Sequence, residues 1–124
     1  MRLPIASALA LVLSALPPAA LAHAVLVKAQ PAGRATLTRA PERVQLWFNE
    51  RLEPAYSSVS VWDAAGARVD AGNGAVSAED PRRLEVSLPA LAAGRYVVRF
   101  RVLSVDGHIV DSSLPFTIKA DPGR

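Results

Sequence analysis

The stretch from Arg95 to Leu103 constrains the fold most, because apolar and polar residues alternate along most of it. In an extended chain, alternate residues point to opposite sides, so its apolar set falls on one side and its arginines on the other. A period of two is typical of a half-buried strand. The apolar set is Tyr96, Val98, Phe100 and Val102, and the arginines are Arg95, Arg99 and Arg101.

Similar but shorter stretches recur at intervals of about ten residues, separated by Pro or Gly. Clear alternation lies in 42–49, 57–63 and 83–88, and short extended pieces are expected at 23–28, 35–37 and 68–70. A polar loop is expected over 104–113 and a final strand over 114–119. About seven short strands without an amphipathic helix predict an all-β fold, an antiparallel sandwich or Greek-key barrel.

Residues 1–22 have the three parts of a signal peptide. They begin with a basic residue, continue with an apolar stretch over 3–16, and end with a small-x-small cleavage site at Ala22. The apolar stretch is short and is followed by two prolines, which argues against a membrane anchor. We expect residues 23–124 to form one exported domain that does not span the membrane. An uncleaved anchor, or a cut one residue away, is the alternative.

Composition excludes several function classes. The formal net charge of the whole chain is +3, and the leader removes one arginine, which leaves a weak and scattered excess of basic residues. That is too little for a nucleic-acid surface. The chain has no cysteine and one methionine, Met1, so disulfides, thiolate ligands and thiol nucleophiles are excluded. It also lacks a G-x-S-x-G elbow, a P-loop and a dinucleotide fingerprint.

The only two histidines stand at chemically favoured positions. Cleavage after Ala22 makes His23 the first residue, whose α-amine and imidazole can chelate a metal together. The other histidine belongs to Asp106-Gly107-His108, where residues at i and i+2 of an extended segment point the same way. An amine, two imidazoles and a carboxylate suit the tetragonal plane of copper(II). If the chain brings these donors together, we expect a copper(II) site; otherwise both are ordinary exposed histidines.

Glu50 is a further candidate, either as a ligand or as an acceptor that orients His108. Its alternative is a solvated loop carboxylate. Trp47 and Trp62 fall on the outward faces of their strands, where cross-strand packing is favoured over a platform for sugars. The outward arginines of 95–103 suit a solvated sheet face or a docking surface.

The order of these motifs resembles the CopC family of periplasmic copper-binding proteins, including its YobA-like members. The resemblance covers essentially the whole region from residue 23 onward. It rests on five segments: 23–26 (HAVL), 30–33 (QPAG), 44–54 (VQLWFNERLEP), 94–108 (GRYVVRFRVLSVDGH) and 116–118 (FTI).

The resemblance implies a seven-stranded, immunoglobulin-like Greek-key barrel or sandwich that is not an enzyme. It implies one copper(II) per chain, held by the amine and imidazole of His23, Asp106 and His108, with Glu50 beside the site. The implied roles are copper resistance, storage or delivery in the periplasm, next to an inner-membrane CopD-like protein. Some members bind copper(I) through a methionine-rich stretch, which this chain lacks.

The chain departs from the family pattern after the triplet. Members commonly have Pro after the histidine and Gly shortly beyond, whereas this chain has Ile109 and then Asp111-Ser112. The shape of that loop is therefore open, and Asp111 could add negative charge near the metal.

Two other function classes are compatible with parts of this sequence. A terminal histidine with a second histidine also resembles the copper site of lytic polysaccharide monooxygenases, although Asp106 would occupy the position where oxygen should bind. A plain exported β-sandwich for adhesion or assembly would bind no copper(II) tightly.

Overall fold

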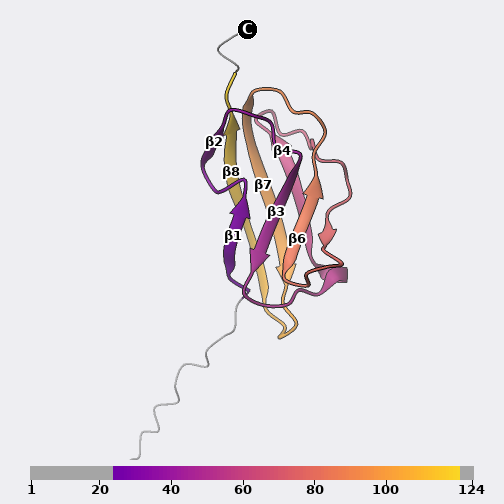
Figure 1. The fold of residues 1–124 in the computed structure, drawn as a ribbon. Coiled ribbons are helices and arrows are strands. Elements are labelled where there is room, and N and C mark those ends of the chain that lie inside the picture. Colours follow the sequence, from indigo (N-terminus) through magenta and orange to yellow (C-terminus); the bar gives the residue numbers. More distant parts are fainter. Residues whose placement is uncertain (1–23, 121–124) are drawn as a thin grey trace, which may run out of the picture.

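The computed structural model describes residues 24–120, which form two four-stranded β-sheets packed face to face (Figure 1). The first sheet has the order β1 (Leu26–Gln30), β3 (Arg43–Phe48), β6 (Arg83–Ser87) and β5 (Ala75–Val76). The second has the order β2 (Ala35–Leu37), β8 (Ile109–Ile118), β7 (Gly94–Leu103) and β4 (Ser58–Asp63). A 3-10 turn, η1 (Pro54–Tyr56), joins β3 to β4. No helix within 24–120 is long and apolar enough to cross a membrane.

The prediction of an all-β, immunoglobulin-like sandwich is confirmed, with two corrections. The two sheets stay separate and do not close into a barrel, and the described residues form eight strands instead of seven. The additional strand is β5, which pairs only two residues with β6. A strand of two residues is too short to show an alternation of apolar and polar side chains.

The core lies between the sheets and contains the inward sets predicted from alternation. The aromatic rings join the two layers or line one of them: Phe48 meets Phe100 edge-on at 5.6 Å, and Tyr96 stacks on Phe116 at 5.3 Å. Burial of this apolar surface is the main force holding the sheets together. The buried predicted residues are Val44, Leu46, Phe48, Val59, Val61, Leu84, Val86, Leu88, Tyr96, Val98, Phe100 and Val102.

The two tryptophans face outward and are half-buried, as predicted. Each packs under a cation from the adjacent strand: Lys28 lies 4.8 Å from the ring of Trp47, and Arg99 lies 4.9 Å from the ring of Trp62. Such cation–π contacts are favourable and also shield the apolar ring. On the outer faces, the two tryptophans therefore pack against side chains of the neighbouring strands.

The predicted polar loop over 104–113 is wrong from residue 109 onward. β8 begins at Ile109 and pairs antiparallel with β7, so that Ile109 opposes Leu103 and Asp111 opposes Arg101. The side chains of 111–113 are exposed, and therefore show no buried alternation. Backbone pairing with β7 forms this part of the strand. The connection between the two strands is accordingly short and contains only residues 104–108.

The Asp70 side chain connects the segment that follows β4 to β4 itself by hydrogen bonds. The segment 68–70, predicted as a strand, contributes only a bridge between Arg68 and Trp62. The Asp70 side chain has no exposed surface, and its carboxylate accepts hydrogen bonds from Val61 N, Gly72 N and Arg68 Nε, each at 2.8 Å. Burial alone would raise the pKa of Asp70, but these bonds outweigh it and lower the pKa below its ordinary value.

Replacing Asp70 with Ala is expected to lower the free energy of unfolding by about 1–3 kcal/mol, because the backbone N–H of the buried residue Val61 loses its acceptor. A carboxyl with a lowered folded pKa stabilises the protein above its unfolded pKa, and this stability is lost as pH falls through the folded pKa. The difference between variant and wild type should therefore shrink in acid. Urea unfolding at neutral and acidic pH measures it. Asp111→Ala, which breaks an exposed pair with Arg101 at 3.7 Å, is the control. A variant as stable as wild type at neutral pH would contradict this account.

Candidate metal centre

The turn between β7 and β8 is closed by its own backbone. Ser104 N donates to the His108 carbonyl at 2.9 Å, and Gly107 N donates to the Ser104 carbonyl at 2.9 Å. Gly107 has a φ of +93°, a conformation that favours glycine over any residue with a Cβ. This geometry explains the glycine of the Asp-Gly-His triplet and brings its two flanking side chains to one side of the turn.

The structure brings Asp106 and His108 into contact. Nδ1 of His108 lies 3.3 Å from Oδ1 of Asp106, and both side chains are about one-third exposed (30% and 31%). The Ser104 hydroxyl donates a hydrogen bond to the same oxygen. The pKa of Asp106 is lowered below its ordinary value mainly by the bond from Ser104 and, to a smaller extent, by the adjacent His108. An ionised carboxylate next to an imidazole is a donor pair of the kind that copper(II) binds.

The start of the described chain is fixed to the connection that follows β3. Val25 N donates to Oδ1 of Asn49 at 2.7 Å, and Asn49 N donates to the Val25 carbonyl at 3.0 Å. Ala24 is buried in the core. His23, which precedes it directly, lies outside the described residues, so the structure places neither its amine nor its imidazole.

The same connection is bonded to the turn that carries Asp106 and His108. Val105 N donates to the Arg51 carbonyl at 3.0 Å, and Leu52, a buried residue, forms a bridge with Ser104. The start of β1, the end of β3 and the β7–β8 turn consequently lie at one end of the sandwich (Figure 1). β1 itself pairs with β3 and not with β7 or β8, so residues 49–52 join the chain start to the turn.

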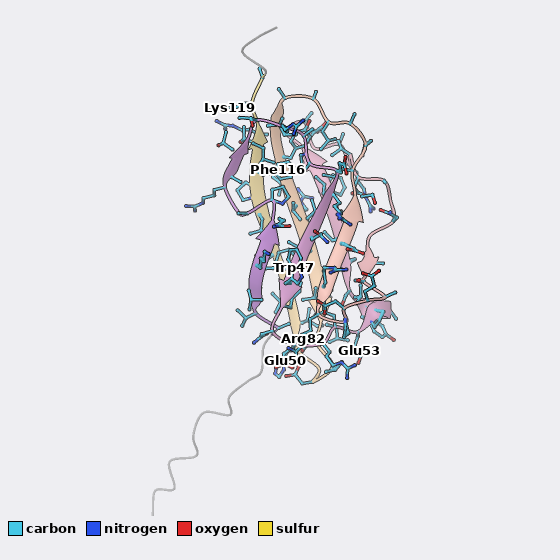
Figure 2. The ribbon with its side chains drawn as sticks, viewed as in Figure 1. Trp47, Glu50, Glu53, Arg82, Phe116 and Lys119 are labelled. Carbon is cyan, nitrogen blue, oxygen red and sulfur yellow. The ribbon has the colours of Figure 1, made fainter. Side chains whose placement is uncertain are left out.

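Glu50 lies within this connection and is half-buried. Figure 2 shows it at the end of the molecule where β3 ends. Its predicted role beside the metal stays a prediction. Sequence reasoning did not identify Asn49, Leu52 or Ser104, the residues that assemble this end through long-range bonds.

Asp106 and His108 form a pair of possible metal donors. Within 24–120, no three side chains among His, Asp and Glu gather closely enough to hold an ion. The pair therefore does not form a three-ligand site by itself.

Known proteins with a similar sequence or fold include members of one family. The model of the CopC domain matches residues 26–119. The chain is 34% identical over 110 residues to the "Copper transport protein CutJ" of Bacillus subtilis (strain 168), covering 87% of this chain but 20% of CutJ. It is 32% identical over 103 residues to "Protein YobA" of Escherichia coli (strain K12), covering 82% of this chain and 83% of YobA. The chain thus spans a fifth of CutJ and most of YobA.

Solved structures agree with these sequence relatives. CopC from Methylosinus trichosporium OB3b superposes with a TM-score of 0.69 at 43% identity, covering 78% of this chain and 94% of that one. PcoC, a methionine-rich copper resistance protein from Escherichia coli, also gives a TM-score of 0.69, at 30% identity, covering 79% and 100%. Of these proteins, CutJ is a copper transport protein by name and PcoC a copper resistance protein by name. The match to the CopC domain over residues 26–119, with these relatives and structures, shows that this chain belongs to the CopC family.

Proposed function

We propose that this chain is an exported protein that holds one copper(II) ion in the periplasm for copper resistance, storage or delivery. The proposed ligands are the α-amine and imidazole of His23, a carboxylate oxygen of Asp106 and the imidazole of His108. The proposal includes removal of residues 1–22, because only a free amine on His23 can join its own imidazole in a chelate.

The observation that carries this proposal is the connection over residues 49–52. It fixes Val25 through Asn49 and the Asp106–His108 turn through Arg51 and Leu52. A residue extends the chain by at most about 3.5 Å, so the backbone of His23 lies within about 7 Å of Val25. That reach supports a site shared by His23 and the turn.

The donor types favour copper(II) over copper(I). All proposed donors are nitrogen or oxygen, and the chain has no cysteine. Thioether and thiolate sulfur are the donors that favour the reduced ion. Reduction should therefore loosen the metal, and the negative charge of the Asp106 carboxylate favours the more highly charged, oxidised ion further.

The name of the relative CutJ supports a partner in copper transport. CutJ, which is named a copper transport protein, contains a region like this chain that makes up 20% of its length. We propose a membrane protein of the CopD kind as the copper acceptor of this chain. The copper is not proposed to be catalytic, because the Asp106 carboxylate would fill the in-plane position that oxygen needs.

Replacing His108 with Ala is expected to lower the copper(II) affinity of the processed protein by about 10–100-fold, since even a partner that only orients a ligand has an effect of this size. The processed wild-type protein should take up one equivalent. Titration in competition with a chelator of known affinity measures both. Val105→Ala removes an exposed apolar side chain from the same turn and serves as the control. Equal affinity of the His108 variant and wild type would exclude the turn from the site.

A further inference from the structure

We propose that Ser104 is a positioning residue of the copper site, whose buried hydroxyl fixes the Asp106 carboxylate in the orientation that the metal needs. The inference rests on the proposed function, because Ser104 has this role only if Asp106 is a ligand. It adds to the ligand set a residue that does not touch the metal.

The burial of Ser104 differs sharply from that of the residues it contacts. Ser104 is 1% exposed, whereas the side chains of Asp106 and His108 are about one-third exposed. Its hydroxyl donates to Oδ1 of Asp106 and accepts a hydrogen bond from His108 N at 3.3 Å. The carbonyl of His108 also lies 3.3 Å away, but a carboxylate is the stronger acceptor for the single hydroxyl proton. One hydroxyl therefore contacts both residues of the triplet that carry donors.

Ser104 is a polar residue in a row of buried apolar ones. Ser104 follows Val98, Phe100 and Val102 at the same two-residue spacing on the inward side of β7, and all three of those side chains are buried. Burying a hydroxyl is unfavourable unless it is hydrogen-bonded. Its hydrogen bond to Asp106 compensates for this burial.

The turn is closed mainly by backbone bonds, to which the Ser104 hydroxyl adds the longer bond from His108 N at 3.3 Å. The backbone bonds run from Ser104 N to the His108 carbonyl and from Gly107 N to the Ser104 carbonyl. The hydroxyl also holds a partly exposed carboxylate, which could otherwise occupy several rotamers. A ligand fixed before the ion arrives loses less conformational freedom on binding. The expected effect of Ser104 is thus on metal affinity and geometry more than on folding.

The test compares Ser104→Ala with Ser57→Ala in the processed protein. Ser57 is a matched control, because it is also buried at this end of the second sheet, where its hydroxyl oxygen accepts a hydrogen bond from Leu103 N at 3.2 Å. We expect Ser104→Ala to weaken copper(II) binding about 10-fold or more, and Ser57→Ala by less than about twofold. Both should lower the melting temperature similarly. The electron paramagnetic resonance spectrum of the copper-saturated Ser104 variant should shift toward that of Asp106→Asn, while that of the Ser57 variant should match wild type.

The Asp106→Asn variant separates the two proposals. If Asp106→Asn binds copper as tightly as wild type, the proposed ligand set is wrong and Ser104 has no role. If Asp106→Asn binds weakly but Ser104→Ala behaves like Ser57→Ala, only the role of Ser104 is overturned. In the double variant, loss of the hydroxyl should have no additional effect, because the interaction it served is already gone.

A measurement on the metal-free wild-type protein covers the case in which Ser104→Ala does not fold. Proton nuclear magnetic resonance should show a slowly exchanging Ser104 hydroxyl proton close to the Asp106 side chain. Rapid exchange, with Ser104 and Asp106 averaging over rotamers, would overturn the inference.

Discussion

One extra residue before His23 is expected to weaken copper(II) binding by about 1,000-fold, given that loss of one orienting partner alone has an effect of about 10–100-fold. The added residue carries the free amine away from the His23 imidazole and replaces it with a peptide nitrogen. The imidazole of His23 then no longer shares a chelate ring with the free amine. The affinities of the processed and extended proteins are compared by competition with the same chelator at one pH.

The control for this experiment adds the same residue after Arg124. That protein should bind copper(II) as tightly as the processed wild type, because its amino terminus is unchanged. Equal affinities for the two extended proteins would rule out the terminal chelate. The turn donors Asp106 and His108 would then have to bind copper with partners other than the amine.

Replacing Leu46 with Ala is expected to lower the free energy of unfolding by about 3–5 kcal/mol. Leu46 is fully buried on β3 and lies opposite Leu84 of β6, another fully buried residue. The substitution removes apolar contacts and leaves a cavity that the close-packed sheets cannot fill. Domains of this size are stable by only about 5–15 kcal/mol, so the variant should unfold at much lower urea concentration.

Tryptophan fluorescence during urea unfolding measures this loss. Val27→Ala, a truncation of an exposed side chain on β1, is the control and should change the stability by less than about 1 kcal/mol. If the two variants were equally stable, Leu46 would not be a core residue.

Alternation predicted the strands that have one buried face. The sets Val44 to Phe48 and Tyr96 to Val102 were assigned inward from their spacing, and the structure buries them. The first half of β8 could not be found in this way. Asp111, Ser112 and Ser113 are exposed, and the strand there depends on backbone pairing with β7, which leaves no mark in the side-chain pattern.

The candidate site was predictable where its geometry is local. Asp106 and His108 are two residues apart and were predicted to lie together, although a turn at Gly107, and not an extended segment, brings their side chains into contact. The long-range bonds of Leu52 could not be predicted, because backbone hydrogen bonding does not select a residue type. The side-chain bond of Asn49 to Val25 N could not be predicted either, because it joins two segments that are far apart in the sequence. Ser104 did leave a signal, since it is a polar residue that continues a row of buried apolar ones. His23 lies outside the described residues, so its part of the site stays a prediction.

The proposed donors come from both layers of the sandwich, because His23 precedes the edge strand of the first sheet and the Asp106–His108 turn joins two strands of the second. A bound ion would therefore act as a cross-link between the layers, a task that disulfides perform in many exported domains. In a protein without cysteine, metal occupancy and resistance to unfolding would be thermodynamically linked, since binding to the folded state alone stabilises it. The survival of the chain among extracytoplasmic proteases would then depend on the copper supply.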